Sequence, residues 1–164
     1  MQSLCVHESG ISRCAEHVAK AIRPGCPVLL FGPMGVGKST FARALLRVLI
    51  PNVAHIPSPS FPIMIAYSGI QGTIWHVDLY RIEVFSDMAP LGLNETIRNE
   101  CCIIEWPDRL GPWMPEQYIS VSLDFISINQ QDDAGLCDQT LWREMMIHRV
   151  GGRLKKLYNN ACLG

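Results

Sequence analysis

Residues 27–39 read Pro-Val-Leu-Leu-Phe-Gly-Pro-Met-Gly-Val-Gly-Lys-Ser. The first part, Pro27–Phe31, is a continuous apolar run of the kind that forms a strand buried on both faces of a parallel sheet. The second part, Gly32–Ser39, matches the phosphate-loop pattern G-x-x-x-x-G-K-[S/T] in full. The next residues, Ser39–Ile50, carry apolar side chains at helical spacing and stop before Pro51. Strand, glycine-rich loop and helix are the context that this motif requires, so we predict a nucleotide site here.

The residue types in this loop follow from the chemistry of phosphate binding. Glycines let backbone N–H groups turn toward phosphate oxygens without a Cβ in the way, and the helix after the loop points its positive dipole end at the same oxygens. Lys38 is expected to span the β- and γ-phosphates as a catalytic group, and the Ser39 hydroxyl to bind Mg²⁺. ATP and Mg²⁺ are therefore the expected ligands. The predicted nucleotide-binding residues of the loop and helix start are Gly32, Gly35, Val36, Gly37, Lys38, Ser39 and Thr40.

The loop alone does not identify a reaction, since kinases, GTPases and motor ATPases share it. A GTPase would usually carry an Asn-Lys-x-Asp element, and the chain has no Asn-Lys pair. A small-molecule kinase usually has an arginine-rich lid, whereas the arginines between Arg81 and Arg149 occur singly. The kinase remains one alternative to an ATPase, and a nucleotide-responsive adaptor with incidental hydrolysis is another.

The rest of the chain predicts an α/β fold. We expect a helix from Ile11 to Ile22, capped by Ser9 and ended by Pro24-Gly25, and a short helix or irregular stretch over Asp87–Asn99. Further strands are expected at Ile63–Tyr67, Thr73–Asp78, Cys101–Trp106, Ile119–Ile128 and Trp142–His148. A turn is expected at Gln130–Gly135 and a basic terminal helix over 149–164. The predicted architecture is a three-layer P-loop NTPase-like domain with a mostly parallel central sheet, spanning 1–164 as a single domain.

Composition narrows the class of protein. The 164 residues are 48% hydrophobic and 18% charged, with a net charge of −1, which is globular and does not indicate a nucleic-acid binder. The 7 cysteines form no C-x-x-C pair, a pattern typical of reduced thiols in a cytoplasmic protein. No apolar run approaches the roughly 18 residues of a membrane helix, so no membrane partner is expected.

Two acidic residues stand at the ends of predicted strands. Asp78 follows Thr-Ile-Trp-His-Val, and Glu105 follows Cys-Cys-Ile-Ile. A carboxylate at the C-terminal end of a strand beside a phosphate loop is where Mg²⁺ and an attacking water are held. One of the two could instead cap its strand or pair with Arg81, and the residues themselves do not rank their roles.

Four ordered motifs resemble one family. The phosphate loop is followed by Ser58-Pro-Ser-Phe61, then by His76-Val-Asp-Leu-Tyr-Arg81, then by Ile104-Glu-Trp-Pro107. This order is similar to that of the TsaE (YjeE) family of bacterial ATPases, over roughly Glu8 to Val150. The family implies a role in threonylcarbamoylation of adenosine 37 (t6A) in tRNAs that read codons beginning with A. Its members are small accessory ATPases that act with a TsaB–TsaD heterodimer, and they meet tRNA indirectly, through the complex.

The resemblance also assigns roles to residues. It implies that Glu105 and Ser39 bind the metal, that Asp78 is the acidic catalytic residue, and that Ser60 acts in a switch loop. It implies positions near the nucleotide for Trp106, Asp108, Arg143 and the segment Ser9–Ile11.

The chain also departs from the family pattern. Ser60 stands where Thr is usual, Pro62 where a second Thr is common, and Pro33 where the loop usually has an acidic residue. Ser60 keeps the hydroxyl, Pro62 stiffens the loop, and Pro33 leaves the backbone cradle intact. We interpret His76 and Tyr80 as packed residues of the core.

Overall fold

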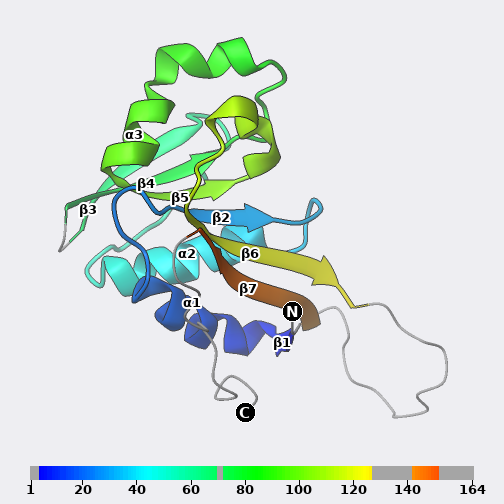
Figure 1. The fold of residues 1–164 in the computed structure, drawn as a ribbon. Helices are drawn as coiled ribbons and strands as arrows, with labels where there is room; N and C mark the ends of the chain where they lie inside the picture. Colours follow the sequence, from blue (N-terminus) through cyan, green and yellow to red (C-terminus); the bar gives the residue numbers. More distant parts are fainter. Residues whose placement is uncertain (1–3, 70–71, 127–141, 152–164) are drawn as a thin grey trace.

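The computed structural model describes residues 4–69, 72–126 and 142–151. Within these ranges seven strands form one sheet in the order β1-β7-β6-β2-β5-β4-β3 (Figure 1). The strands are β1 (Leu4–His7), β2 (Val28–Phe31), β3 (Met64–Gly69), β4 (Gly72–Asp78), β5 (Cys101–Glu105), β6 (Tyr118–Phe125) and β7 (Trp142–Val150).

The centre of the sheet is parallel, as predicted. Strand β2 lies between β5 and β6 and is parallel to both, and β4 is parallel to β5. The outer pairs β1–β7, β6–β7 and β3–β4 are antiparallel. Because parallel strands have their carboxyl ends at the same edge, β2, β4 and β5 all deliver their last residues to one place.

Helices cover both faces of the sheet, which makes three layers (Figure 1). On one face lie α1 (Ile11–Ala19) and α2 (Lys38–Leu49). On the other lie α3 (Leu93–Asn99) and the 3₁₀ segments η2 (Phe85–Leu91) and η3 (Pro107–Trp113). A short 3₁₀ turn, η1 (Glu8–Gly10), leads into α1.

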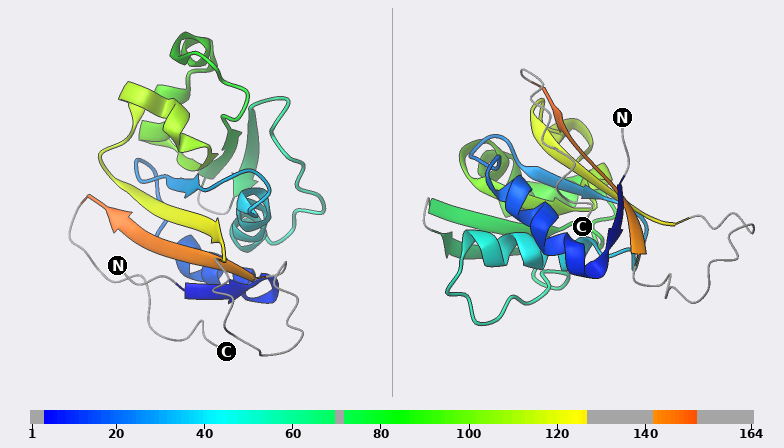
Figure 2. Two further views of the ribbon diagram at one scale, coloured as in Figure 1. Left: turned by 90° about the vertical axis from the view of Figure 1, so that its right-hand side faces the viewer. Right: turned by 90° about the horizontal axis from the view of Figure 1, so that it is seen from below.

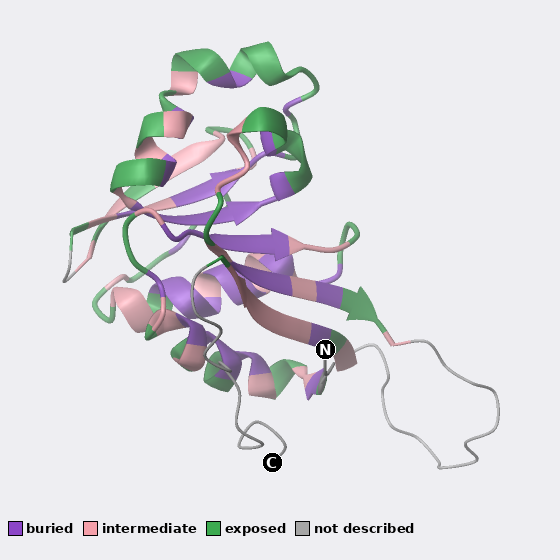
Figure 3. Ribbon diagram, viewed as in Figure 1, coloured by how far each residue is buried: buried purple, intermediate pink, exposed green. Residues whose placement is uncertain are grey.

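Alternation along the central strands divides the interior into two cores. On β2, Leu30 packs in the core beneath α1 and α2, whereas Leu29 packs in the core beneath α3. All five residues of β5 are buried, as a strand covered on both faces requires (Figure 3). Cys102 is part of this interior, and burial raises the pKa of its thiol to about 12.

No helix in the described ranges is long and apolar enough to cross a membrane.

The structure corrects several element boundaries. Strand β1 was not predicted, and it extends the sheet by pairing with β7, as the views in Figure 2 show. Helix α1 ends at Ala19, short of Ile22. Its N-cap is Gly10, because Ser9 lies in η1, where its N–H donates to the His7 ring.

The C-terminal predictions are partly wrong and partly outside the described residues. Strand β7 runs to Val150, because Arg149 and Val150 continue the ladder against Ile119 and Tyr118. The predicted helix therefore does not begin at 149. Its remainder, the turn at Gln130–Gly135 and the end of the predicted strand Ile119–Ile128 lie outside the described residues.

Candidate nucleotide site

The phosphate loop, Gly32–Ser39, connects β2 to α2 and turns sharply at its glycines. Gly32 has φ 134° and Gly37 has φ 109°, values that residues with a Cβ rarely adopt. At Gly32 a Cβ would also collide with the carbonyl oxygen of Leu123 on β6. At Gly37 a Cβ would meet no atom within 4 Å. The loop is therefore close-packed where it leaves the sheet and open where α2 begins.

Lys38 lies at the centre of this loop. Its Nζ donates to the carbonyl oxygens of Gly32 and Pro33, each at 2.7 Å. The same Nζ stands 3.8 Å from the centroid of the Trp106 ring. Only 5% of Lys38 is exposed. The ammonium is thus held against the wall of the loop and faces the ends of the central strands.

Burial and nearby carboxylates act on the Lys38 ammonium in opposite directions. Burial lowers the pKa of Lys38, because the charged form loses hydration. The negative charge of Glu105 is the largest opposing cause, followed by Asp78 and then Asp108. The charges of all three acidic residues therefore favour the protonated form of the same ammonium.

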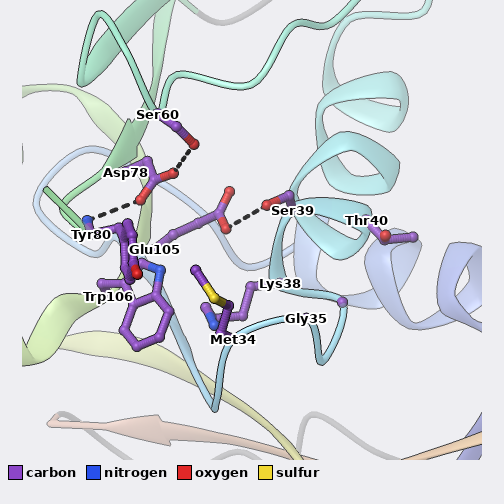
Figure 4. A pocket seen from close by; sticks show the side chains of 11 residues that line it. Met34, Gly35, Lys38, Ser39, Thr40, Ser60, Asp78, Tyr80, Glu105 and Trp106 are labelled. Carbon is purple, nitrogen blue, oxygen red and sulfur yellow. Dashed lines mark hydrogen bonds between the residues drawn. The ribbon is translucent and has the colours of Figure 1, made fainter.

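Asp78 and Glu105 are direct neighbours in the sheet. They pair in register at the ends of the parallel strands β4 and β5, and both are buried. Glu105 Oε2 accepts a hydrogen bond of 2.8 Å from the Ser39 hydroxyl at the start of α2. Figure 4 shows this contact at the middle of the cleft. The two carboxylates converge on the loop, as predicted from their strands.

Each oxygen of Asp78 has a partner. The Ser60 hydroxyl donates to Oδ2 at 2.5 Å, and the N–H of Tyr80 donates to Oδ1 at 3.0 Å (Figure 4). Ser60 in turn shares a 2.9 Å hydrogen bond with Ser58. The backbone N–H of Asp78 donates to the carbonyl of Ile63 at 2.9 Å. Residues 57–63 (Pro-Ser-Pro-Ser-Phe-Pro-Ile), which we call the proline-rich segment, are therefore attached to the end of β4.

The other oxygen of Glu105 contacts His76. Its Oε1 lies 2.9 Å from His76 Nε2, and His76 is fully buried. The residue after Glu105, Trp106, adopts a left-handed backbone with φ 58°. Strained conformations of this kind cluster at functional sites.

These side chains surround a cleft of about 270 Å³ (Figure 4). Nine of the predicted site residues line it: Gly35, Gly37, Lys38, Ser39, Thr40, Ser60, Asp78, Glu105 and Trp106. Met34 and Tyr80 line it as well, and neither was predicted from the sequence to belong to the site. Tyr80 is 42% exposed and its ring is 5.1 Å from that of Trp106, so its interpretation as a core residue was wrong.

Four other predicted residues and the predicted segment Ser9–Ile11 do not line the cleft. Gly32 and Val36 belong to the loop but lie behind its open face, and the Val36 side chain is buried. Asp108 is exposed at the start of η3, and its negative charge acts to raise the pKa of Lys38. Arg143 on β7 donates from Nε to the Val36 carbonyl at 2.9 Å. Arg143 therefore supports the loop from behind.

The donor set of the cleft fits Mg²⁺. A hydroxyl on Ser39 and carboxylate oxygens on Glu105 and Asp78 are hard ligands of the kind that Mg²⁺ prefers. In the described ranges no group of three or more His, Cys, Asp or Glu side chains could hold a metal by itself. Mg²⁺ usually takes one or two carboxylates and completes its shell with water and substrate phosphates, so this set is sufficient.

The chain is similar to known proteins in sequence and in structure. A family model described as "Threonylcarbamoyl adenosine biosynthesis protein TsaE" matches residues 5–133. The tRNA threonylcarbamoyladenosine biosynthesis protein TsaE of Rickettsia bellii is 31% identical over 139 residues, 85% of this chain and 94% of that protein. Its counterpart in Treponema pallidum is 30% identical over 122 residues, 73% of this chain and 89% of that protein. The crystal structure of Bacillus subtilis YdiB has a TM-score of 0.65 and 22% identity, covering 92% of this chain and 87% of that chain, which supports the fold alone.

Proposed function

Because this chain belongs to the TsaE family of tRNA threonylcarbamoyladenosine biosynthesis, we propose that it is an ATPase accessory to that modification. It binds and hydrolyses ATP with Mg²⁺, and it supports a TsaB–TsaD-like heterodimer that threonylcarbamoylates adenosine 37. Its connection to tRNA is indirect, through that complex.

The observation that carries the proposal is the convergence of five side chains on one cleft: Lys38, Ser39, Ser60, Asp78 and Glu105. They come from four segments that are distant in sequence: the loop with α2, the proline-rich segment, the end of β4 and the end of β5. A cation, two hydroxyls and two carboxylates at the carboxyl edge of a parallel sheet are the parts that phosphoryl transfer from a nucleotide needs.

Phosphate binding falls to the loop. The backbone N–H groups at the start of α2 would contact phosphate oxygens, and so would the ammonium of Lys38, which the carbonyls of Gly32 and Pro33 hold within the loop. Ser39 and Glu105 would hold Mg²⁺, which when bound supplies a Lewis acid that neutralises phosphate charge. The hydrogen bond between Ser39 and Glu105 keeps these two ligands together.

Asp78 would orient the attacking water. Both of its oxygens already accept hydrogen bonds, from Ser60 and from the N–H of Tyr80, so its orientation is fixed. The Ser60 contact joins the carboxylate to the proline-rich segment, whose Phe61 is 81% exposed. A change in the position of the Asp78 carboxylate would thus move the segment that carries Phe61, which a partner could contact. Nucleotide switches operate by such loop rearrangements.

The accessory role is supported by what the cleft lacks. No arginine side chain lines it in the part of the chain that the structure describes. An arginine supplied by a partner can accelerate such hydrolysis by about 10³–10⁵-fold. We therefore infer that the chain alone is slow and that its partner completes the site.

Phosphate release from the purified chain tests the proposal. Wild-type protein should hydrolyse ATP with Mg²⁺ and not with EDTA, and folded Lys38→Ala protein should show no hydrolysis because the ammonium is lost. Near-normal turnover of Lys38→Ala would contradict the placement of the site. A phosphorylated product on added small-molecule acceptors would instead support a kinase.

A further inference from the structure

We propose that His76 is a positioning residue that fixes the Glu105 carboxylate for Mg²⁺ and disfavours larger cations. This inference rests on the proposed function, in which Glu105 is a metal ligand. The two oxygens of Glu105 have different partners: Oε1 lies 2.9 Å from His76 Nε2, and Oε2 accepts from Ser39 at 2.8 Å.

The direction of the histidine contact follows from elementary chemistry. An ionised carboxylate can only accept, so His76 Nε2 carries the proton in this bond. The Nδ1 atom of the same ring is buried and has no hydrogen-bond partner among the described residues. Among the described residues, the bond to Glu105 is therefore the only polar contact of the imidazole ring. This contact offsets the free-energy cost of burying the ring.

The position of His76 excludes a direct role toward the nucleotide. It is 0% exposed, it lies within β4 between Ile65 of β3 and Ile103 of β5, and it does not line the cleft. It acts through Glu105, which is itself 1% exposed. Without the imidazole, the buried Glu105 carboxylate would lose one of the two hydrogen-bond partners that it has among the described residues and would be free to rotate away from Ser39.

The contact also limits how Glu105 can bind a metal. Since Oε1 is engaged by His76, only Oε2, on the Ser39 side, remains oriented to the cleft. A carboxylate that offers one oxygen suits the compact octahedral shell of Mg²⁺. Ca²⁺ is larger and often takes both oxygens of one carboxylate. His76 therefore contributes both affinity for Mg²⁺ and discrimination against Ca²⁺.

Three variants separate positioning from packing. His76→Gln places an amide N–H₂ near the position of Nε2 and can still donate to Glu105. His76→Asn buries the same amide but is too short to reach Glu105. His76→Met fills the space without a donor. Ile103→Val, beside His76 in the sheet, is a control that loosens the same region and leaves the Glu105 contact intact.

The test measures metal binding in the ADP complex, without turnover. Free Mn²⁺ is followed by electron paramagnetic resonance, and bound Mn²⁺ is then displaced by Mg²⁺ or Ca²⁺. His76→Asn and His76→Met should weaken Mn²⁺ and Mg²⁺ binding by about 10–100-fold, the usual effect of losing a residue that orients a metal ligand. In both variants the ratio of Mg²⁺ affinity to Ca²⁺ affinity should also be smaller than in wild type. His76→Gln and Ile103→Val should bind Mg²⁺ within a few-fold of wild type.

Glu105→Gln distinguishes the two ways in which this inference could fail. If Glu105→Gln binds metal like wild type, the proposed metal site is wrong. If Glu105→Gln loses metal but His76→Asn and His76→Met keep wild-type affinity and selectivity, the role of His76 is overturned and the metal site stands. Histidine ¹⁵N spectra of the wild-type chain with Mg²⁺ and ADP need no variant. They should show His76 protonated at Nε2, and a proton on Nδ1 alone would also overturn the proposal.

Discussion

Two glycines of the same loop should respond differently to the addition of one methyl group. Gly32→Ala should mainly destabilise the fold, and Gly37→Ala should mainly abolish nucleotide binding. Both residues have positive φ, at 134° and 109°, so both alanines carry conformational strain. They differ in surroundings, because a Cβ at Gly32 collides with the backbone of Leu123 and a Cβ at Gly37 points into open space.

The magnitudes depend on these surroundings. Strain alone costs about 1–3 kcal/mol for each alanine. Gly32→Ala adds an overlap with backbone that has to move, worth about 1–3 kcal/mol more by analogy with overpacked cores. Gly37 lines the cleft, so its new methyl group occupies space that we assign to phosphate. Gly37→Ala should therefore lose nucleotide affinity out of proportion to its stability.

Urea unfolding and ATP binding, measured on both variants and wild type, check this prediction. Gly32→Ala should lose roughly 2–6 kcal/mol of unfolding free energy and Gly37→Ala roughly 1–3 kcal/mol. ATP affinity should fall further in Gly37→Ala than in Gly32→Ala. Equal loss of stability in both, with wild-type ATP affinity in Gly37→Ala, would refute the assignment of the open face of the loop to phosphate.

The site and the core support three more predictions. Asp78→Asn should bind ATP normally but lose turnover at every Mg²⁺ concentration, whereas Glu105→Gln should be partly rescued by high Mg²⁺; rescue of Asp78→Asn instead would reverse the two roles. The purified chain alone should turn over ATP more slowly than about 1 s⁻¹, the lower end of typical enzyme rates, and a fast rate would favour an autonomous enzyme. Iodoacetamide at pH 8 should label exposed Cys5 and spare Cys102, whose pKa of about 12 keeps the thiol protonated, as peptide mass spectrometry can verify.

The centre of the fold could be predicted because its signals are local. Strands β2 and β5 are buried on both faces, so they appear as continuous apolar runs, and the loop motif predicts a turn and then a helix directly after β2. Strand β1 could not be found this way. It has four residues and is stabilised by pairing with β7, more than 130 positions later in the chain. No periodicity within Leu4–His7 indicates that partner.

The site was predictable to the extent that its motifs lie at strand ends. Asp78 and Glu105 were expected at one edge of the sheet, and they pair in register there. The Glu105 contact of His76 was missed, because a polar ring within a strand resembles a packed core residue. The signal was present in the alternation of β4, which puts His76 on the same face as Asp78. Arg143 was expected near the nucleotide, and in the structure it contacts the phosphate loop through the backbone carbonyl of Val36.

The central claim, that ATP acting at this cleft drives an accessory step in tRNA modification, is tested most directly by counting modified nucleosides. A reaction containing tRNA, a TsaB–TsaD heterodimer, the threonylcarbamoyl donor and ATP is run with wild-type chain, with Lys38→Ala and with no chain. Threonylcarbamoyladenosine is then quantified by mass spectrometry of digested tRNA. We predict repeated turnover with wild-type chain and no more product with Lys38→Ala than with no chain. Equal product with Lys38→Ala and wild type would contradict the account.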